Sequence, residues 1–354
     1  MGSGSAGRLY LRQSCQGCSL RYVACADVDG ARAEALAEEY GISRACSPEE
    51  LLADPAVDVV VNLTPAPEHG WVGRQVLWAG KHLYAEKPLA PDVRQGAALL
   101  ALARRRGLRV GCAPDTFLGP ALQTARGLVD SGYLGTPFAA SATVAMPPPD
   151  TWHPRPAAFY GTAAGPLFDM GPYYLTALVS LLGPVARVAG MATVAPRERR
   201  SMITGELIEP VVPTHEIGVV EFASGPVATL CISFDAAATA APPMELHGTL
   251  GTLRLPDPNA GSGPILACAR GDSEWTEVPA AATGGQSRCI GIEDMGAAIR
   301  EGRPHRASGD LALHVLDVME SLRRSAATGR MVHLRTTCAR PEPLPVADLA
   351  ERRR

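Results

Sequence analysis

The sequence predicts an α/β protein with two domains: a doubly wound parallel sheet, followed by an α+β domain with a large, mostly antiparallel sheet. Its 354 residues exceed what one ordinary hydrophobic core holds. The first third alternates strand-like and helix-like segments, which is typical of a parallel sheet. The later half contains consecutive strand-like runs joined by short turns, which is typical of an antiparallel sheet. We therefore expect domains at residues 1–118 and 119–340, with a tail at 341–354.

The first domain is predicted from apolar runs and helix boundary signals. A mostly apolar run at residues 20–27 is followed by an alanine-rich, amphipathic helix at residues 31–40, which Gly41 ends. Ser47 and Glu50 have the spacing of a capping box, which marks the start of the next helix. Strands and helices then alternate at residues 57–63, 71–79, 83–85, 91–106 and 108–111.

The second domain is predicted from hairpin signals. Two β-rich runs, residues 216–222 and 227–234, are joined by Ala-Ser-Gly-Pro, which indicates a turn. Residues 244–247 and 252–255 flank a Gly-Thr-Leu-Gly turn in the same way. Residues 306–328 form a long amphipathic pattern, which predicts a helix near the end of the chain.

The composition excludes several classes of function. A net charge of −3 provides no electrostatic footprint for nucleic acid or an anionic membrane surface. No run of about 18 apolar residues is present, so we expect no transmembrane helix. The first residues lack the apolar core of a signal peptide, and we expect a cytoplasmic protein.

The nine cysteines predict reduced thiols rather than a disulfide framework. Cys15 and Cys18 form the one CxxC motif, but no second pair of ligands follows at the spacing of a zinc site. No other combination of His, Asp and Glu has convincing metal-ligand spacing. We therefore expect no metal.

A dinucleotide site is predicted at the start of the chain. Gly2, Gly4 and Gly7 fit the pattern GxGxxG, and Asp27 lies 20 residues beyond Gly7. In a Rossmann unit such glycines let the backbone approach a pyrophosphate, and the acid binds the ribose hydroxyls. The alternative is a Gly/Ser linker. Asp27 would repel a 2′-phosphate and favours NAD, whereas Arg32 could accommodate that phosphate and keeps NADP open.

The fingerprint begins at residue 2, although a strand should precede it. That strand is central in the usual order, so we expect the first strand of the sheet to be missing and its neighbours to have a gap between them. Either a truncated chain or a start assigned downstream of the true one would produce this pattern.

A chemical site is predicted at the end of the strand at residues 83–85. Glu86, Lys87 and Pro88 follow it, and the carboxyl edge of a parallel sheet is where ligands bind. Lys87 would orient a substrate hydroxyl and stabilise negative charge on its oxygen. Glu86 would hold that ammonium or contact the cofactor amide. The alternative for Lys87 is a strand-end lysine in water.

Asp169 and Tyr173 form the second part of this site. They share one helix face if Gly171 and Pro172 open a helix. A phenol with its usual pKa near 10 is a poor base, but a neighbouring ammonium such as Lys87 would lower the pKa of Tyr173 and allow it to move a proton. The alternative is that Tyr173 is a core aromatic of an inactive protein.

An aromatic loop around Trp152 and His153, with Phe159 and Tyr160, precedes this segment. Aromatic faces suit the C–H surfaces of sugar rings, and His153 could supply an acid or base. The alternative is a packed loop with no ligand.

Residues 80–88, 165–174 and 248–252 together resemble the glucose–fructose oxidoreductase, inositol dehydrogenase and MocA (Gfo/Idh/MocA) family of nicotinamide-dependent sugar oxidoreductases. The family's signatures are Glu-Lys-Pro and a later Asp-x-Gly-x-His. This chain has the first signature and carries Tyr173 where the family usually has histidine.

The resemblance implies roles for further residues. Thr64 and Pro65 would line the cofactor, while His69 would cap the next helix or touch the ribose. The alternative for His69 is a histidine at a helix start with no ligand. Asp169 would bind a substrate hydroxyl, and Asp115 would contact the substrate or the nicotinamide. The antiparallel sheet would build a homodimer or homotetramer.

We therefore predict an NAD(P)-dependent oxidoreductase that acts on a secondary alcohol of a sugar, cyclitol or related polyol. Lys87 and Tyr173 would handle the proton, and no metal is needed. The rival prediction is a dinucleotide- or sugar-binding protein without turnover, which cofactor reduction with a panel of polyols would distinguish.

Overall fold

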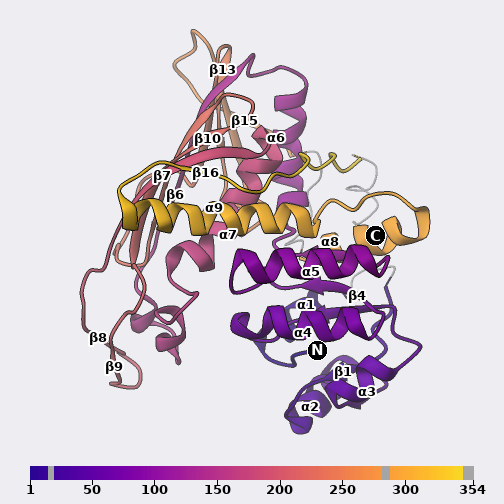
Figure 1. Cartoon of the computed structure of the whole chain (residues 1–354). Helices are drawn as coiled ribbons and strands as arrows, with labels where there is room; N and C mark the ends of the chain where they lie inside the picture. The colour runs from indigo at the N-terminus through magenta and orange to yellow at the C-terminus, as the bar shows by residue number, and fades with distance from the viewer. Residues whose placement is uncertain (15–19, 281–287, 346–354) are drawn as a thin grey trace.

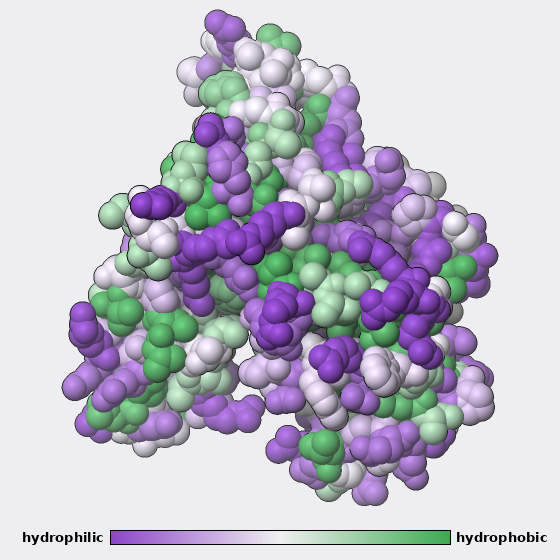
Figure 2. All heavy atoms as spheres, viewed as in Figure 1, coloured by the Kyte–Doolittle hydropathy of each residue, from purple (hydrophilic) through white to green (hydrophobic). Residues whose placement is uncertain are grey.

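The computed structural model describes residues 1–14, 20–280 and 288–345. The CxxC motif at 15–18 and residues 346–354 of the predicted tail lie outside the described residues. Figure 1 shows a large sheet on one side of the molecule and the smaller parallel sheets on the other, with helix α9 (Gly309–Thr328) running across the boundary between them. In the space-filling view a notch separates the lower lobes of the two parts (Figure 2).

The first part alternates strands and helices, as predicted. Its helices are α1 (Ser5–Ser14), α2 (Gly30–Tyr40), α3 (Pro48–Ala53), η1 (Ala66–Glu68), α4 (His69–Trp78) and α5 (Val93–Arg105). Its strands are β1 (Cys25–Ala26), β2 (Ala45–Cys46), β3 (Val59–Asn62), β4 (His82–Ala85) and β5 (Val110–Cys112). The predicted capping box is confirmed, because the Ser47 side chain accepts from the Glu50 backbone N–H and the Glu50 side chain accepts from the Ser47 backbone N–H.

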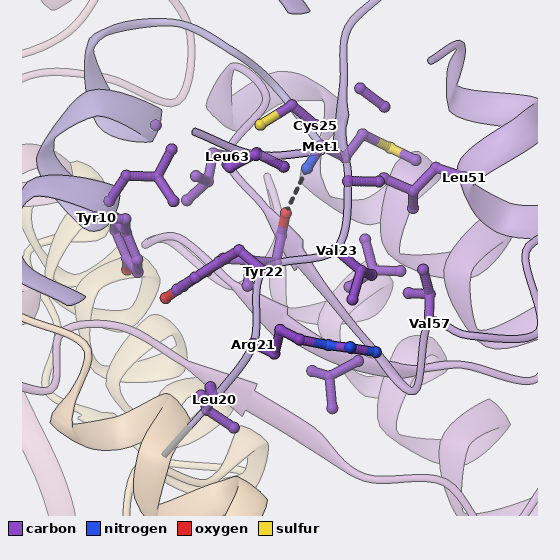
Figure 3. Close-up of a pocket in the computed structure, with 18 of the residues that line it drawn as sticks. Met1, Tyr10, Leu20, Arg21, Tyr22, Val23, Cys25, Leu51, Val57 and Leu63 are labelled. Carbon is purple, nitrogen blue, oxygen red and sulfur yellow. Dashed lines mark hydrogen bonds between the residues drawn. The ribbon is translucent and has the colours of Figure 1, made fainter. Parts of the chain in front are cut away.

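The parallel strands form two small sheets rather than one. Strands β3, β4 and β5 pair in that order, and β1 pairs with β2 separately. Among the residues that the structure describes, Met1 and Gly2 lie between β1 and β3: Met1 hydrogen-bonds to Val61 and Leu63 on the β3 side, and Gly2 hydrogen-bonds to Ala26 of β1. Figure 3 shows the bond from the Met1 amino group as a dashed line. The predicted gap in the sheet is therefore present. The strand expected over residues 20–27 is reduced to β1, because residues ahead of Cys25 face the gap instead of a partner strand.

The second part supplies the following elements. Its helices are η2 (Thr116–Leu118), α6 (Pro120–Asp130), η3 (Pro149–Thr151), η4 (Pro156–Phe159), α7 (Pro166–Leu182), α8 (Ile290–Glu301) and α9. Its strands are β6 (Pro137–Ala145), β7 (Val185–Thr193), β8 (Arg199–Arg200), β9 (Leu207–Ile208), β10 (His215–Phe222), β11 (Val227–Ser233), β12 (Met244–Gly248), β13 (Gly251–Leu255), β14 (Ile265–Ala269), β15 (Thr276–Val278) and β16 (Val332–His333).

Nine of these strands form one sheet in the order β15-β14-β13-β12-β6-β11-β10-β7-β16. The pair β11–β6 is parallel and the other pairs are antiparallel, which confirms the prediction of a mostly antiparallel sheet. Both predicted hairpins, β10–β11 and β12–β13, are present. Helices α7 and α9 cover one face of this sheet (Figure 1).

Helix α9 joins the two parts of the molecule. It begins at Gly309 rather than at residue 306, because the side chain of Ser308 caps it by accepting from the Leu311 N–H. It packs on β7 and α7 on one side and on α5 on the other, where the Glu320 carboxylate accepts from the Val93 N–H. This packing fixes the end of β4 opposite the start of α7. Over the described residues, none of the helices has both the length and the apolar character needed to span a membrane.

Candidate active site

Lys87 stands at the carboxyl end of β4, where it was predicted. β4 is the middle strand of its sheet and is fully buried from Leu83 to Ala85. Glu86 and Lys87 are the first residues beyond the buried part of this strand. His69 contacts the loop that follows β4. Its buried ring lies 2.6 Å from the Pro88 carbonyl oxygen through Nδ1 and 2.8 Å from the Thr64 carbonyl oxygen through Nε2. His69 thus ties the loop after β3 to the loop that carries Lys87.

Asp169 and Tyr173 lie one turn apart on α7, as predicted, but the predicted start of this helix, at Gly171 and Pro172, was wrong. The helix begins at Pro166, and Pro172 is inside it. Pro172 has no N–H, so the carbonyl of Phe168 loses its helical donor. The helix tolerates this because it is buried along almost its whole length between the large sheet and α9, so packing outweighs the missing bond.

Lys87, Asp169 and Tyr173 come together across the boundary between the two parts. Lys87 Nζ donates to Asp169 Oδ1 at 2.8 Å and to the Asp169 carbonyl oxygen at 2.7 Å. The same nitrogen lies 5.2 Å from the centre of the Tyr173 ring. Burial by itself would lower the pKa of Lys87, but Asp169, Tyr173 and Glu86 outweigh it, and the pKa is raised. The ammonium therefore stays charged at all physiological pH values.

The Tyr173 hydroxyl meets a second cation that the sequence did not predict. Arg288 donates to Tyr173 Oη at 3.0 Å and to Asn259 Oδ1 at 2.8 Å, and its guanidinium lies 5.4 Å from the Tyr173 ring centre. Since the guanidinium can only donate, Tyr173 Oη acts as acceptor in this bond and its own proton is free to point elsewhere.

The pKa of Tyr173 differs from the expectation. Lys87 and Arg288 both lower it, but burial raises it more and Glu86 adds to the rise, so the pKa lies above its usual 10. The phenol is therefore protonated at neutral pH. In this state it is suited to donate a proton, whereas the sequence had predicted a phenol primed to accept one.

Glu86 does not pair with the ammonium of Lys87. One carboxylate oxygen accepts from the Tyr10 hydroxyl at 2.9 Å, and the other accepts from the Lys87 backbone N–H at 3.0 Å. Tyr10 lies on α1, next to the glycine pattern. Glu86 thus links the expected cofactor helix to the end of β4.

The glycines at the chain start have the shape that a dinucleotide needs. Gly2 has φ +93°, and a Cβ there would lie 2.6 Å from the backbone of Leu63, so only glycine fits. A Cβ at Gly4 would meet nothing within 4 Å, which leaves open space above the first turn of α1. Gly7 packs α1 close to Leu36. A pyrophosphate at this helix N-terminus would face backbone N–H groups, so these residues fit the predicted cofactor.

Asp27 follows β1, as predicted. Its carboxylate accepts from the backbone N–H of Ser3 at 2.7 Å and from that of Asp29 at 3.0 Å, which fixes the glycine loop against β1. Arg32 is exposed and pairs with Asp29 at 3.1 Å.

The Thr64 hydroxyl donates to Asn62 Oδ1, and Pro65 caps η1 at the carboxyl end of β3. These two residues therefore sit at the same sheet edge as Lys87.

Asp115 is deeply buried, with a side chain that points toward the start of α8. Its carboxylate accepts from the Gly291 N–H at 2.9 Å. Burial raises the pKa of Asp115 to about 6, against the opposing effects of the Gly291 N–H and Arg288. This carboxyl therefore joins α8 to the end of β5 and is costly to ionise.

Replacing Asp115 by Asn is expected to stabilise the protein at neutral pH. Because the pKa of this carboxyl is raised, the free energy of unfolding falls as the pH rises from about 4 to about 6. Above pH 6 it stays lower by on the order of 2–3 kcal/mol. An amide keeps an acceptor for Gly291 without this cost. Urea unfolding at pH 4 and pH 7.5 should show a gain for Asp115→Asn only at the higher pH. An equal effect at both values would contradict the ionisation argument.

Trp152 and His153 lie in an aromatic cluster with Phe159. The Trp152 and His153 rings meet edge to face at 5.5 Å, and His153 meets Phe159 at 4.8 Å. Trp152 is 45% exposed. The Asp150 carboxylate accepts a hydrogen bond from the Tyr160 hydroxyl and forms an ion pair with Arg199. These buried contacts stabilise the loop.

Comparison with known proteins identifies two matching regions. Residues 1–113 match GFO_IDH_MocA, described as an oxidoreductase family with an NAD-binding Rossmann fold, and residues 122–254 match the GFO/IDH/MocA C-terminal domain. The chain is 32% identical over 307 residues to dTDP-3,4-didehydro-2,6-dideoxy-alpha-D-glucose 3-reductase of Streptomyces violaceoruber, across 83% of this chain and 84% of that one.

Solved structures share the fold. An NAD binding oxidoreductase from Klebsiella pneumoniae has a TM-score of 0.82 at 24% identity and covers 94% of this chain and 97% of its own. Levoglucosan dehydrogenase in complex with NADH and levoglucosan has a TM-score of 0.80 at 19% identity, over 95% of this chain and 98% of its own.

The fold and the matches define a nicotinamide-dependent oxidoreductase of the dehydrogenase class. The chain belongs to the GFO/IDH/MocA family. The predicted family resemblance, the two-part fold class and the NAD-type cofactor are thereby confirmed.

Proposed function

We propose that this protein transfers hydride between a nicotinamide dinucleotide and a secondary alcohol carbon of a sugar, cyclitol or related polyol. The observation that carries the proposal is the contact of Lys87 with Asp169 and Tyr173 at the boundary between the two parts. It puts an ammonium, a carboxylate and a protonated phenol at the carboxyl edge of the parallel sheet, where ligands of such folds bind.

These residues suit the chemistry at the substrate oxygen. Gly2, Gly4, Gly7 and Asp27 would hold the dinucleotide, which would supply or accept the hydride when bound. In the direction of reduction, Tyr173 gives its proton to the carbonyl oxygen as the carbon gains hydride, and Lys87 stabilises the negative charge that develops there. In the direction of oxidation, the same proton returns to Tyr173. Asp169 accepts a hydrogen bond from a neighbouring substrate hydroxyl.

The raised pKa of Tyr173 favours reduction of a keto sugar as the working direction. A proton donor is ready at neutral pH, while the reverse reaction would first require a phenolate. The relative from Streptomyces violaceoruber is by name a 3-reductase of a dTDP-linked didehydro sugar, which supports the same direction. The partly exposed ring of Trp152 is suited to the C–H face of such a ring.

Arg288 is proposed as a positioning residue for Tyr173. Its hydrogen bond to Oη turns the phenolic proton toward the substrate, and its charge stabilises the phenolate that proton donation leaves behind. Asn259 holds the guanidinium in place.

Arg288→Gln is expected to lower kcat about ten- to a hundredfold and to leave KM for the sugar little changed, because the lost contact acts on the proton donor. Arg288→Lys should recover part of the rate. The pH at which reduction declines should move upward in Arg288→Gln, since one of the cations that lower the pKa of Tyr173 is gone. A matched control is Arg254→Gln, which removes a guanidinium that lies over Trp275. An unchanged pH profile in Arg288→Gln would contradict this role.

Turnover tests the proposed function directly. Nicotinamide absorbance is followed with NAD⁺ or NADP⁺ and a panel of sugars, cyclitols and polyols, and with NADH or NADPH and a panel of keto sugars. Lys87→Met serves as the inactive control. Asp27 leads us to expect a preference for NAD. Tight dinucleotide binding without turnover on any panel would instead support a binding protein.

The open face of the large sheet supports a homodimer or homotetramer. Adjacent strands β7, β10 and β11 expose Met191, Ile217, Val219 and Val227 on the face away from α7 and α9. A second copy would bury these side chains. The described free cysteines, none in a disulfide, support a reducing compartment such as the cytoplasm.

Ile217→Lys combined with Val219→Glu is expected to shift the assembly to monomers, because charges would replace the apolar centre of the face. Sedimentation of the wild-type and variant proteins measures this. A surface change away from the sheet, Trp78→Lys, should leave the assembly intact. If both variants sediment as the wild type does, the sheet face is not the interface.

A further inference from the structure

A basic groove lies beside the start of β5, at the edge of the parallel sheet opposite Lys87. It has a volume of about 410 Å³, and residues 302–305 from the loop between α8 and α9 form one of its sides. Helix α9 packs on α5, and α8 and α9 both pack on β5 (Figure 1). Because β4 and β5 are parallel, the groove is at the amino-terminal edge of the sheet, away from the expected dinucleotide and substrate sites.

Two of the three arginines that line the groove have carboxylate partners. Arg104 of α5 pairs with Asp310 in the first turn of α9. Arg303 pairs with Asp294 at 2.9 Å and with Glu301 at 2.6 Å, both on α8. These pairs connect α5 to α9 and the loop to α8, so the walls of the groove are fixed relative to one another.

Arg109 is the third lining arginine, and its charge is not balanced in this way. Among the residues that the structure describes, no carboxylate forms an ion pair with it. Its guanidinium donates to the Arg303 carbonyl oxygen. A guanidinium has five N–H donors, so donors of Arg109 remain for a ligand. The residue is half-buried, which strengthens its interaction with an anion relative to that of a fully exposed cation.

Two histidines lie next to Arg109 and respond to its charge. His82 Nδ1 accepts from the Arg109 backbone N–H at 2.9 Å, and His305 Nε2 lies 3.0 Å from the Val110 carbonyl oxygen. Burial lowers the pKa of both histidines, and the charge of Arg109 acts in the same direction. Both rings are therefore mainly neutral at pH 7, and an anion beside Arg109 would relieve this effect.

The rest of the lining is mostly apolar and sets the size and character of a ligand. It includes Leu100, Ala103, Leu108, Val110 and Pro304. Small-molecule sites measure about 300–1,000 Å³, so this groove has the size for a small organic molecule. A guanidinium beside an apolar wall suits a molecule with an anionic group at one end and an apolar body at the other. The donors of a guanidinium match two oxygens of a phosphate group.

We propose that this groove binds a phosphate monoester of a small organic molecule. The phosphate pairs with Arg109, and the organic part lies against Leu100, Leu108 and Pro304. Asp310 does not repel the ligand strongly, because its charge is paired with Arg104. The site is distinct from the one proposed for hydride transfer, since it lies at the other edge of the sheet from Lys87.

Calorimetry with the full chain tests the proposal, with phenyl phosphate as the probe and excess NADH present to occupy the dinucleotide site. Saturable binding is expected at submillimolar concentration. Inorganic phosphate, which lacks the apolar part, should bind more weakly, and benzyl alcohol, which lacks the anion, should not bind. No saturable binding of phenyl phosphate, or equal affinity for inorganic phosphate, would overturn the proposal.

Arg109→Gln is expected to weaken phenyl phosphate binding at least about tenfold, because the charge-assisted hydrogen bonds to the phosphate are lost. The matched control is Arg105→Gln, which removes an exposed cation of α5 that does not line the groove. Its affinity should be close to that of the wild type. Equal losses in both variants would mean a general charge effect and would overturn the proposal.

Pro304→Glu provides a second test in case Arg109→Gln folds poorly. Pro304 is an exposed lining residue, so the new carboxylate would repel the phosphate without disturbing the core. Weaker binding is expected. Lys87→Met should bind the probe as the wild type does. A loss in Lys87→Met with none in Pro304→Glu would place the probe at the active site and overturn the proposal.

The histidine rings give a local readout by NMR. Bound phenyl phosphate should raise the pKa of His305, because it adds negative charge beside the imidazole. His305→Gln identifies the resonance. The rise should be absent in Arg109→Gln. An unchanged titration of His305 in wild-type protein saturated with the probe would overturn the proposal.

Discussion

Replacing Lys87 by Met is expected to lower kcat at least about a thousandfold, because in the proposed mechanism one ammonium serves both the substrate oxygen and the phenol of Tyr173. The side chain of Met has nearly the same length and no charge. The proposed dinucleotide site at Gly2, Gly4 and Gly7 is untouched, so cofactor affinity should stay within a few-fold of the wild type. Steady-state rates and a fluorescence titration with NADH measure the two quantities separately.

The sequence provides a matched control for this change. Lys81 is the only other lysine, and its ammonium donates to the Asp54 carbonyl, away from the site. Lys81→Met should keep the wild-type rate. Because Lys87→Met leaves Asp169 without its cation, thermal unfolding must show that the variant is folded at the assay temperature. A folded Lys87→Met protein with a rate near the wild-type value would remove Lys87 from the proposed chemistry.

Replacing Tyr173 by Phe is expected to lower kcat for keto-sugar reduction about 10²- to 10⁴-fold, the usual contribution of a general acid. The ring and its packing remain, so Lys87 and Asp169 keep their pair. The wild-type rate should be level through neutral pH and decline only in the alkaline range, because the pKa of Tyr173 is raised above 10. Oxidation should rise over the same alkaline range. Both alkaline limbs should be absent in Tyr173→Phe.

Tyr174→Phe is the neighbouring control, since it removes a hydroxyl that donates to Asp257 instead of facing Lys87. It should change the rate by only a few-fold and leave the pH profile intact. Full activity of Tyr173→Phe alongside an inactive Lys87→Met would show that the lysine works without the phenol. A water molecule or another side chain would then have to move the proton.

Local signals were sufficient for much of the fold. The C-terminal end of α2 and the start of α3 could be predicted because Gly41, Ser47 and Glu50 act through residues near them in sequence. The hairpins β10–β11 and β12–β13 could be predicted because each turn lies between its own strands. The start of α7 was missed because Pro172 looks like a first-turn residue, and only the packing around the helix permits it inside.

In the site, too, features with a local sequence signal could be predicted and features that depend on distant residues could not. Lys87 could be predicted because it follows a short apolar strand and precedes a proline. Arg288 could not be predicted, since it lies 115 residues from Tyr173 and no spacing relates the two. The net pKa of Tyr173 was also beyond the sequence, because its direction depends on how deeply the ring is buried.

The ion pair between Lys87 and Asp169 has a consequence for how such a protein can change. The first residue belongs to the half that carries the glycine loop, and the second belongs to the half that carries the large sheet. Neither half alone holds both charges, so under the proposed mechanism an isolated half would not catalyse the reaction. In evolution, the half with the large sheet could therefore be replaced by one that prefers a different sugar ring, while the half with the glycine loop is kept. The replacement would need a carboxylate at the position of Asp169 to pair with Lys87.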